Sequence, residues 1–84
     1  MMTNTPKPAS LRIHVEFAVK QYLASLDRDK QEATNLYEFF LHELEKPLLT
    51  TVLQHTRGNQ SKTAKILGLN RGTLRSKLKN HGLL

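Results

Sequence analysis

The last third of the sequence carries the side chains best suited to chemistry with an anion. Residues 57–84 contain seven Lys and Arg residues and no Asp or Glu, which gives this stretch a net charge of +7. Residues 1–56 contain six basic and seven acidic residues, a net charge of −1. This asymmetry predicts that one segment meets a polyanion while the other has a different task. A solvated basic surface, or one that binds an anionic membrane, is the alternative.

Two arginines in this segment have the spacing needed to read a base. Arg71 and Arg75 are four residues apart, so on a helix their guanidinium groups are neighbours, and arginine pairs bidentately with guanine O6 and N7 in a major groove. Leu74 and Leu78 mark the narrow buried side of the same helix. The rest of its surface is expected to be rich in hydrogen-bond donors: Gly72, Thr73, Ser76, Lys79 and Asn80, flanked by Arg71, Arg75 and Lys77. Gly72 either lets a partner approach closely or is a tolerated helix glycine.

Two short helices joined by a tight turn position these side chains. Asn59 is expected to cap the first helix, which ends at Gly68, and Asn70 to cap the second, which ends at Gly82. This plan is a helix-turn-helix. Its small core is predicted to consist of Ala64, Leu67, Leu69, Leu74 and Leu78.

Upstream, apolar residues at helical spacing predict two longer helices. The first is expected over residues 11–26, with Ser10 as its cap. The second is expected to begin at Asn35, where Glu38 completes a capping box. Pro47 lies inside the second helix, and because apolar periodicity resumes directly after it, a kinked helix is favoured over two separate helices.

The predicted fold class is all-α, with four helices per chain. Residues 1–10 read as a disordered tail, 11–57 as a helical dimerisation region and 58–84 as a helix-turn-helix region that binds DNA. The apolar faces of the first two helices are too broad to be covered by each other alone. Two copies of the pair are therefore predicted to build a shared four-helix core in a homodimer.

Several function classes are disfavoured by what the sequence lacks. It has no cysteine, which excludes disulfides and thiolate zinc sites and fits a reducing cytoplasm. Its N-terminus has no apolar signal segment, and its longest apolar run is three residues, so no membrane association is expected. No Phe, Tyr or Trp follows Phe40, which favours duplex DNA over RNA modules that stack bases on aromatic rings.

No catalytic, metal or cofactor site is predicted. The run His42–Lys46 starts like a zinc-protease motif, but lysine stands where the second histidine belongs. The other three histidines are scattered, and there is no nucleophile–base pair and no phosphate-binding glycine-rich loop.

The runs Thr56–Gln60 and Leu67–Arg75 closely resemble the bacterial Fis family, named for the factor for inversion stimulation. The resemblance continues upstream through Leu36–Glu38, Glu45 and Pro47–Leu49 and covers about residues 10–84. It implies a homodimer in which the first two helices of each chain interlock and the last two form paired helix-turn-helix units. In that family the recognition helices lie closer together than one turn of straight DNA, so the DNA bends. The implied function is nucleoid architecture and transcriptional regulation with low sequence specificity.

The resemblance also assigns roles to residues. Asn70 and Arg71 would contact bases, and Arg75 would reach into the groove. Phosphates would be held by Asn59, Ser61, Lys62, Thr73 and Lys77. The predicted DNA-binding set is completed by Gln60, Ser76, Lys79 and Asn80. RNA polymerase would be met by Arg57, Gly58 and Gln60. The alternative is a detached or truncated output domain of a sigma-54-type response regulator, which ends in a similar helix-turn-helix.

Overall fold

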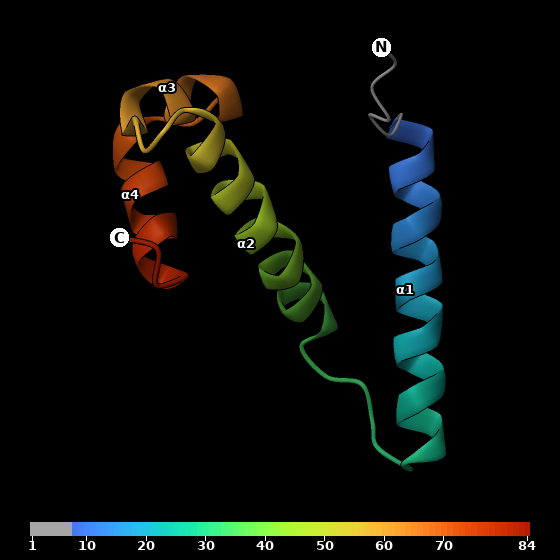
Figure 1. Ribbon diagram of the computed structural model, residues 1–84. Coiled ribbons are helices and arrows are strands. Elements are labelled where there is room, and N and C mark those ends of the chain that lie inside the picture. The colour runs from blue at the N-terminus through green and yellow to red at the C-terminus, as the bar shows by residue number, and fades with distance from the viewer. Residues whose placement is uncertain (1–7) are drawn as a thin grey trace. The chain divides into compact units, whose positions relative to one another are not determined.

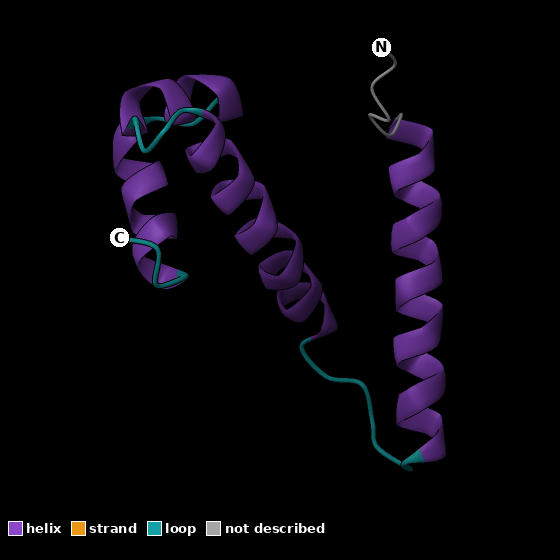
Figure 2. Ribbon diagram, in the orientation of Figure 1, coloured by secondary structure: helices purple, strands orange, loops and turns teal. Residues whose placement is uncertain are grey.

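The computed structural model describes residues 8–84, and within that range it contains only helices, turns and loops (Figures 1 and 2). The helices are α1 (Pro8–Arg28), α2 (Leu36–His55), α3 (Gln60–Leu67) and α4 (Arg71–Asn80). The predicted all-α class with four helices is confirmed. The chain divides into two compact units, one that ends at Asn35 and one that spans Leu36–Leu84, and each is described by itself.

α1 begins earlier and ends later than the sequence predicts. It starts at Pro8, so Ser10 lies inside the helix and the prediction that Ser10 caps it is wrong. Proline fits the first position of a helix because its missing N–H would have no partner there and its φ is already helical. Of the predicted tail 1–10, residues 1–7 lie outside the described residues and the other three are helical.

α2 is one helix that continues through Pro47, which confirms the prediction of a single helix over two separate helices. Its start differs in detail from the expected capping box. Asn35 precedes the helix at the predicted place, but its φ is +55°, in the left-handed region. An N-cap residue normally has an extended backbone, so Asn35 does not have the geometry that a capping box with Glu38 requires.

Both long helices expose large apolar side chains. In α1 these are Leu11, Ile13, Val15, Phe17 and Leu23. In α2 they are Tyr37, Phe39, Leu41, Leu44 and Leu48. Among the described helices, none has a stretch long and apolar enough to cross a membrane. So many exposed apolar residues on two helices are typical of a surface that another protein covers.

The second unit is held together by a small core. Figure 1 shows α3 lying across the carboxyl end of α2, with α4 running back beside α2. Leu49, Ala64, Leu74 and Leu78 are buried at the centre of this unit. The half-buried residues packed around them are Leu53, Leu67, Leu69 and Leu83. This core anchors α3 and α4 on α2.

Candidate nucleic-acid interface

Each helix of the helix-turn-helix starts at an asparagine, as the sequence predicts. Asn59 Oδ1 accepts a hydrogen bond from the Lys62 amide at 3.0 Å, and Asn70 Oδ1 accepts one from the Thr73 amide at 2.7 Å. Both asparagines have an extended backbone, as N-caps should. The amides that precede the capped one in each helix have no partner within that helix, and such amides are well placed to bind phosphate.

The turn between α3 and α4 closes as a Schellman motif. Gly68 has φ +72°, and its amide donates to Lys65 O at 3.2 Å. The Leu69 amide donates to Ala64 O at 2.9 Å. A left-handed backbone conformation is required at this point, and glycine adopts it without strain. The predicted end of the first helix at Gly68 is confirmed, and the tight turn fixes where α4 begins.

α4 has one buried side and one exposed side. Leu74 and Leu78 are fully buried, as the sequence predicts. The residues exposed on the other side are Arg71, Gly72, Arg75, Ser76, Lys79 and Asn80. Thr73 and Lys77 are half-buried. The exposed set therefore forms a surface of donors and positive charges that α2 and α3 do not cover.

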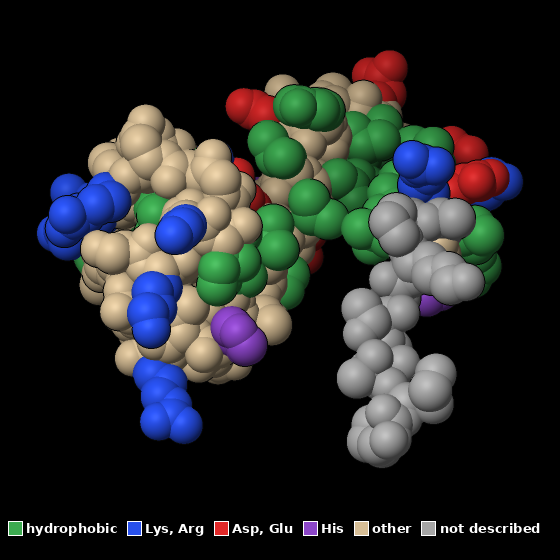
Figure 3. All heavy atoms as spheres, turned by 90° about the horizontal axis from the view of Figure 1, so that it is seen from above, with side chains coloured by type: hydrophobic (Ala, Val, Ile, Leu, Met, Phe, Trp, Pro, Cys, Tyr) green, Lys and Arg blue, Asp and Glu red, His purple; other side chains and the backbone are tan. Residues whose placement is uncertain are grey.

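The arginines of this surface are not engaged in ion pairs with the part of the chain that the structure describes. Within residues 8–84, no salt bridge involves Arg71, Arg75 or Lys79. Figure 3 shows Lys and Arg side chains projecting outward from the second unit. Their charges are available to an external anion, and the guanidinium groups have the fork geometry that suits a guanine edge or a phosphate.

Asn70 has two possible tasks. Its Oδ1 caps α4 through the Thr73 amide, and the residue itself is exposed. The side-chain NH2 group is not used by the cap, so it remains a donor at the amino end of the helix. One side chain can thus start the helix and offer donors to a base edge.

The amino end of α3 brings together four of the predicted contact residues. Asn59, Ser61 and Lys62 are exposed, and Gln60 is half-buried. Thr63, which the sequence analysis missed, is fully buried just behind them. Its hydroxyl donates to Asn59 O at 2.9 Å and lies 2.7 Å from the Thr56 hydroxyl. This pair of threonines ties the start of α3 to the end of α2, with no local pattern that would reveal it.

Among the predicted contact residues with a positive charge, Lys77 differs because, within residues 8–84, it alone forms a salt bridge. Its Nζ lies 2.6 Å from Glu45 Oε2, and Glu45 Oε1 lies 2.9 Å from His81 Nε2. Hydrogen bonds from Lys77 and then from His81 hold the pKa of Glu45 below its usual value of 4.5, although burial acts in the other direction. The sequence assigned no role to Glu45 or His81 and did not predict that they pair, since they lie 36 residues apart along the chain.

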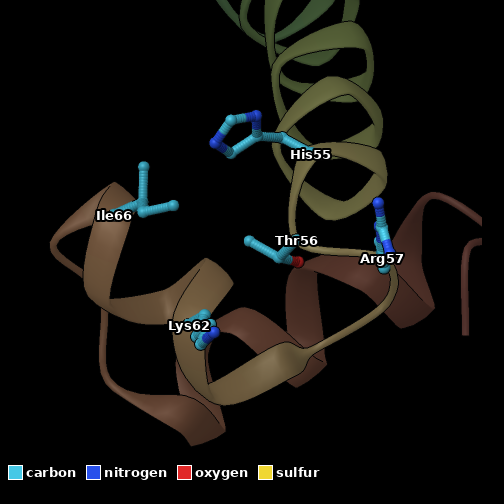
Figure 4. Close-up of a pocket in the computed structure, with 5 residues that line it drawn as sticks. All are labelled: His55, Thr56, Arg57, Lys62 and Ile66. Carbon is cyan, nitrogen blue, oxygen red and sulfur yellow. The ribbon is translucent and has the colours of Figure 1, made fainter.

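The turn between α2 and α3 carries the residues expected to meet a protein partner. Arg57 has φ +56° and Gly58 has φ +82°, so two successive residues are left-handed. The Gly58 amide donates to Leu53 O at 2.9 Å. Beside this turn lies an open surface pocket of about 380 Å³, lined by His55, Thr56, Arg57, Lys62 and Ile66 (Figure 4). A non-glycine residue held at positive φ stores backbone strain, which is common at functional turns.

The parts of the chain that match known proteins include both the helix-turn-helix and the helices before it. A family model described as "Bacterial regulatory protein, Fis family" matches residues 40–81. The chain is also similar to DNA-binding protein Fis of Vibrio cholerae, Vibrio campbellii and Vibrio parahaemolyticus. In each case 53% of residues are identical over 79 residues, which cover 94% of this chain and 76% of the relative.

Proposed function

The chain belongs to the Fis family of bacterial regulatory proteins, and on that premise we propose that it is a homodimer that binds and bends double-stranded DNA. It acts in nucleoid architecture and in the regulation of transcription, with low sequence specificity. Its place of action is then the bacterial nucleoid, in the cytoplasm. The observation that carries the proposal is the exposed side of α4, where arginines and hydrogen-bond donors are presented with no acidic residue on α3 or α4.

DNA contacts are divided between bases and phosphates. α4 enters the major groove, where Arg71, Arg75 and the free NH2 group of Asn70 meet base edges. Phosphates are held by side chains at the amino end of α3, including exposed Ser61 and Lys62, and by the first amides of both helices. Phosphate contacts supply most of the affinity and make it fall with salt, while the base contacts supply the modest sequence preference.

The homodimer is supported by the exposed apolar residues of α1 and α2. Eighty-four residues hide too little surface to make a robust isolated monomer, and the chain has no cysteine with which to form disulfides. Pairing of two chains would bury the apolar side chains of both long helices. It would also present two copies of α4 to the same duplex.

Bending follows from the pairing of two recognition helices. As the family resemblance implies, the helices lie closer together than one turn of straight DNA. Both can then enter successive major grooves only if the duplex curves. Smooth bending of a short site costs of order 1–6 kcal/mol, depending on the sequence that is bent. Flexible sequences are therefore preferred even where no side chain touches a base.

A second surface serves a protein partner. The turn formed by Arg57 and Gly58, together with Gln60, is exposed or half-buried beside the pocket of Figure 4 and is the surface offered to RNA polymerase. The strained φ of Arg57 and the basic lining of the pocket support an interaction role for this turn.

The alternative of a detached output domain of a sigma-54-type response regulator is not favoured. The Vibrio relatives are matched over about three quarters of their own length, and they are named DNA-binding protein Fis. No catalytic role is part of the proposal.

The proposal is tested by a gel-shift titration on circularly permuted duplex probes at two salt concentrations, beside equilibrium sedimentation of the free protein. We expect a dimer, complexes whose mobility depends on the position of the site in the probe, and an affinity that falls steeply with salt. A monomer, or a mobility that is independent of the site's position, would contradict the bending mechanism. A complete lack of duplex binding would contradict the function itself.

A further inference from the structure

One polar cluster joins α2 to α4 on the side away from the exposed donors. Glu45 of α2 uses both carboxylate oxygens, with Oε2 2.6 Å from Lys77 Nζ and Oε1 2.9 Å from His81 Nε2. The side chain of His81 is only 2% exposed, that of Glu45 20% and that of Lys77 33%. Ion pairs in such partly buried places are stronger and more sharply oriented than pairs on an open surface.

The arrangement of the cluster fixes the orientation of α4 on α2 as well as the contact between the two helices. Lys77 and His81 are four residues apart, so they meet one carboxylate from two points about one helical turn apart. Leu74 and Leu78 hold α4 against the core, but hydrophobic contacts are non-directional and permit small rotation and sliding. Two hydrogen bonds to one carboxylate restrict both the tilt and the rotation of α4 on α2.

His81 contacts two residues of α2, Glu45 and His42. The carboxylate can only accept, so His81 Nε2 carries the hydrogen of its bond to Glu45. The other ring nitrogen, Nδ1, is buried and has no hydrogen-bond partner among residues 8–84. The His42 ring of α2 lies against the His81 ring, with centroids 4.2 Å apart. α2 thus contacts the carboxyl end of α4 through Glu45 and His42 together.

We propose that the Glu45–Lys77–His81 cluster sets the orientation of α4 on α2, and that Lys77 is a positioning residue for DNA recognition rather than a phosphate contact. The proposal rests on the proposed function, because α2 is there the helix that pairs with the partner chain. Any rotation of α4 on α2 then changes the separation of the two recognition helices. That separation decides which spacing of half-sites the dimer binds best.

The test measures the spacing profile of the full-length dimer. Duplexes carry two identical half-sites whose separation varies in steps of one base pair, and affinity is measured for each at several salt concentrations. Lys77→Met removes the ammonium and keeps the aliphatic stem, whereas Lys77→Arg retains the charge. Lys79→Met is the matched control, because it removes the same charge from an exposed position of the same helix. Glu45→Gln tests the other partner.

We expect Lys77→Met and Glu45→Gln to change how affinity depends on the spacing of the half-sites. Either the spacing with the highest affinity shifts, or the ratio of its affinity to that of the neighbouring spacings falls by about threefold or more. The slope of log affinity against log salt should stay as in the wild type for Lys77→Met. Lys77→Arg should restore the profile. Lys79→Met should leave the profile unchanged, whatever it does to the slope.

Two results would overturn the positioning role. One is an unchanged profile with a flatter salt slope for Lys77→Met, which is the signature of a lost phosphate contact. The other is a loss of affinity that is equal at every spacing and matches the folded fraction measured by circular dichroism. Such a loss is the signature of an effect on stability alone. If Glu45→Gln does not fold, the comparison of Lys77→Met with Lys77→Arg decides. Failure of the wild type to bind any duplex would instead contradict the proposed function.

Discussion

Arg71 and Lys62 illustrate how two exposed cations on one domain can do different work. Arg71 is the first residue of α4, where its guanidinium could reach a base edge, and Lys62 lies in the first turn of α3, where its ammonium could reach a phosphate. Arg71→Ala should therefore lower affinity for the preferred site by about 1–3 kcal/mol and relax the sequence preference. Lys62→Ala should weaken binding to all sequences alike and reduce the salt slope by about 1 for each lost contact. Titrations on a preferred and a shuffled duplex separate the two effects, and equal behaviour of the variants would contradict this division.

Gly72 provides a second test at the scale of one residue. A Cβ at Gly72 would meet only Asn70 Oδ1 at 3.5 Å, an ordinary contact, so the fold itself leaves room for alanine. Gly72→Ala should leave stability unchanged or raise it by up to about 1 kcal/mol, because glycine is a poor helix former. It should nevertheless weaken DNA binding if the backbone of α4 approaches the duplex closely. Thermal unfolding and gel-shift titration of the same variant give the two readouts.

Gly68 is the matched control for Gly72. A Cβ at Gly68 would meet nothing within 4 Å, but its φ of +72° is strained for any residue with a side chain. Gly68→Ala should destabilise the fold by about 1 kcal/mol or more. A loss of affinity in Gly72→Ala without loss of stability, beside a loss of stability in Gly68→Ala, would assign Gly72 to the interface. Unchanged affinity in Gly72→Ala would instead make it a tolerated helix glycine.

At the scale of an element, the start of α4 shows how a helix signal and a binding group can share one side chain. Asn70→Ala removes the cap of the Thr73 amide and should cost about 1 kcal/mol of stability. Asn70→Ser keeps a cap oxygen but has no NH2 group, so its stability should stay within a few tenths of a kcal/mol of the wild type. Both variants should lose DNA affinity. If Asn70→Ser binds as well as the wild type, the residue serves the helix alone.

The link between α2 and α4 predicts a definite dependence of stability on pH. Because the pKa of Glu45 is lowered in the folded state, its contribution is present above pH 4.5 and is lost as the pH falls through the folded value. At neutral pH, Glu45→Gln should lower the free energy of unfolding by about 1–3 kcal/mol, as for hydrogen bonds to a charged group. The gap between wild type and variant should close as the pH falls below 4.5. Urea unfolding at several pH values measures this difference in the free energy of unfolding. A difference that stays the same at every pH would contradict the predicted role of Glu45.

How far the elements could be predicted depends on how local their signals are. Asn59, Gly68 and Asn70 were placed correctly because a cap or a left-handed turn needs only its own few residues. The predicted Ser10 cap is wrong because Pro8 is itself a good first residue of a helix. The pairing of Lys77 with Glu45 spans 32 residues and could not be predicted, because no periodicity or spacing encodes it. The exposed side of α4 was predictable since Leu74 and Leu78 alone define its buried side.

At the scale of the whole molecule, exposed apolar surface and net positive charge belong to different parts of the chain. α1 and α2 expose large apolar side chains, while α3 and α4 carry basic residues with no acidic residue and have little exposed apolar surface beyond Ile66. A monomer would therefore leave its apolar helices in water and bring only one recognition helix to the duplex. In the proposed mechanism, affinity and bending both require that the two halves of a dimer act together.

This dependence yields a prediction that separates dimer formation from DNA contact. Val15 lies on α1, 39% exposed, within the stripe of apolar residues expected to pack in the dimer. In an isolated chain, Val15→Lys would place a lysine on an exposed helix with little effect. In a dimer it loses about 1.5–3 kcal/mol of burial per chain and places two charges in an apolar interface. The dissociation constant of the dimer should rise at least about tenfold, since each 1.4 kcal/mol is a factor of ten.

Gln21→Lys is the control, because it adds the same charge to an exposed polar position of the same helix. Equilibrium sedimentation should show a dimer for this control and a monomer for Val15→Lys at concentrations where the wild type is paired. At those concentrations Val15→Lys should bind DNA weakly and give complexes whose mobility no longer depends on the position of the site. A Val15→Lys protein that remains a dimer and still bends DNA would show that α1 does not form the interface, and the pairing of the recognition helices would then have to depend on α2 alone.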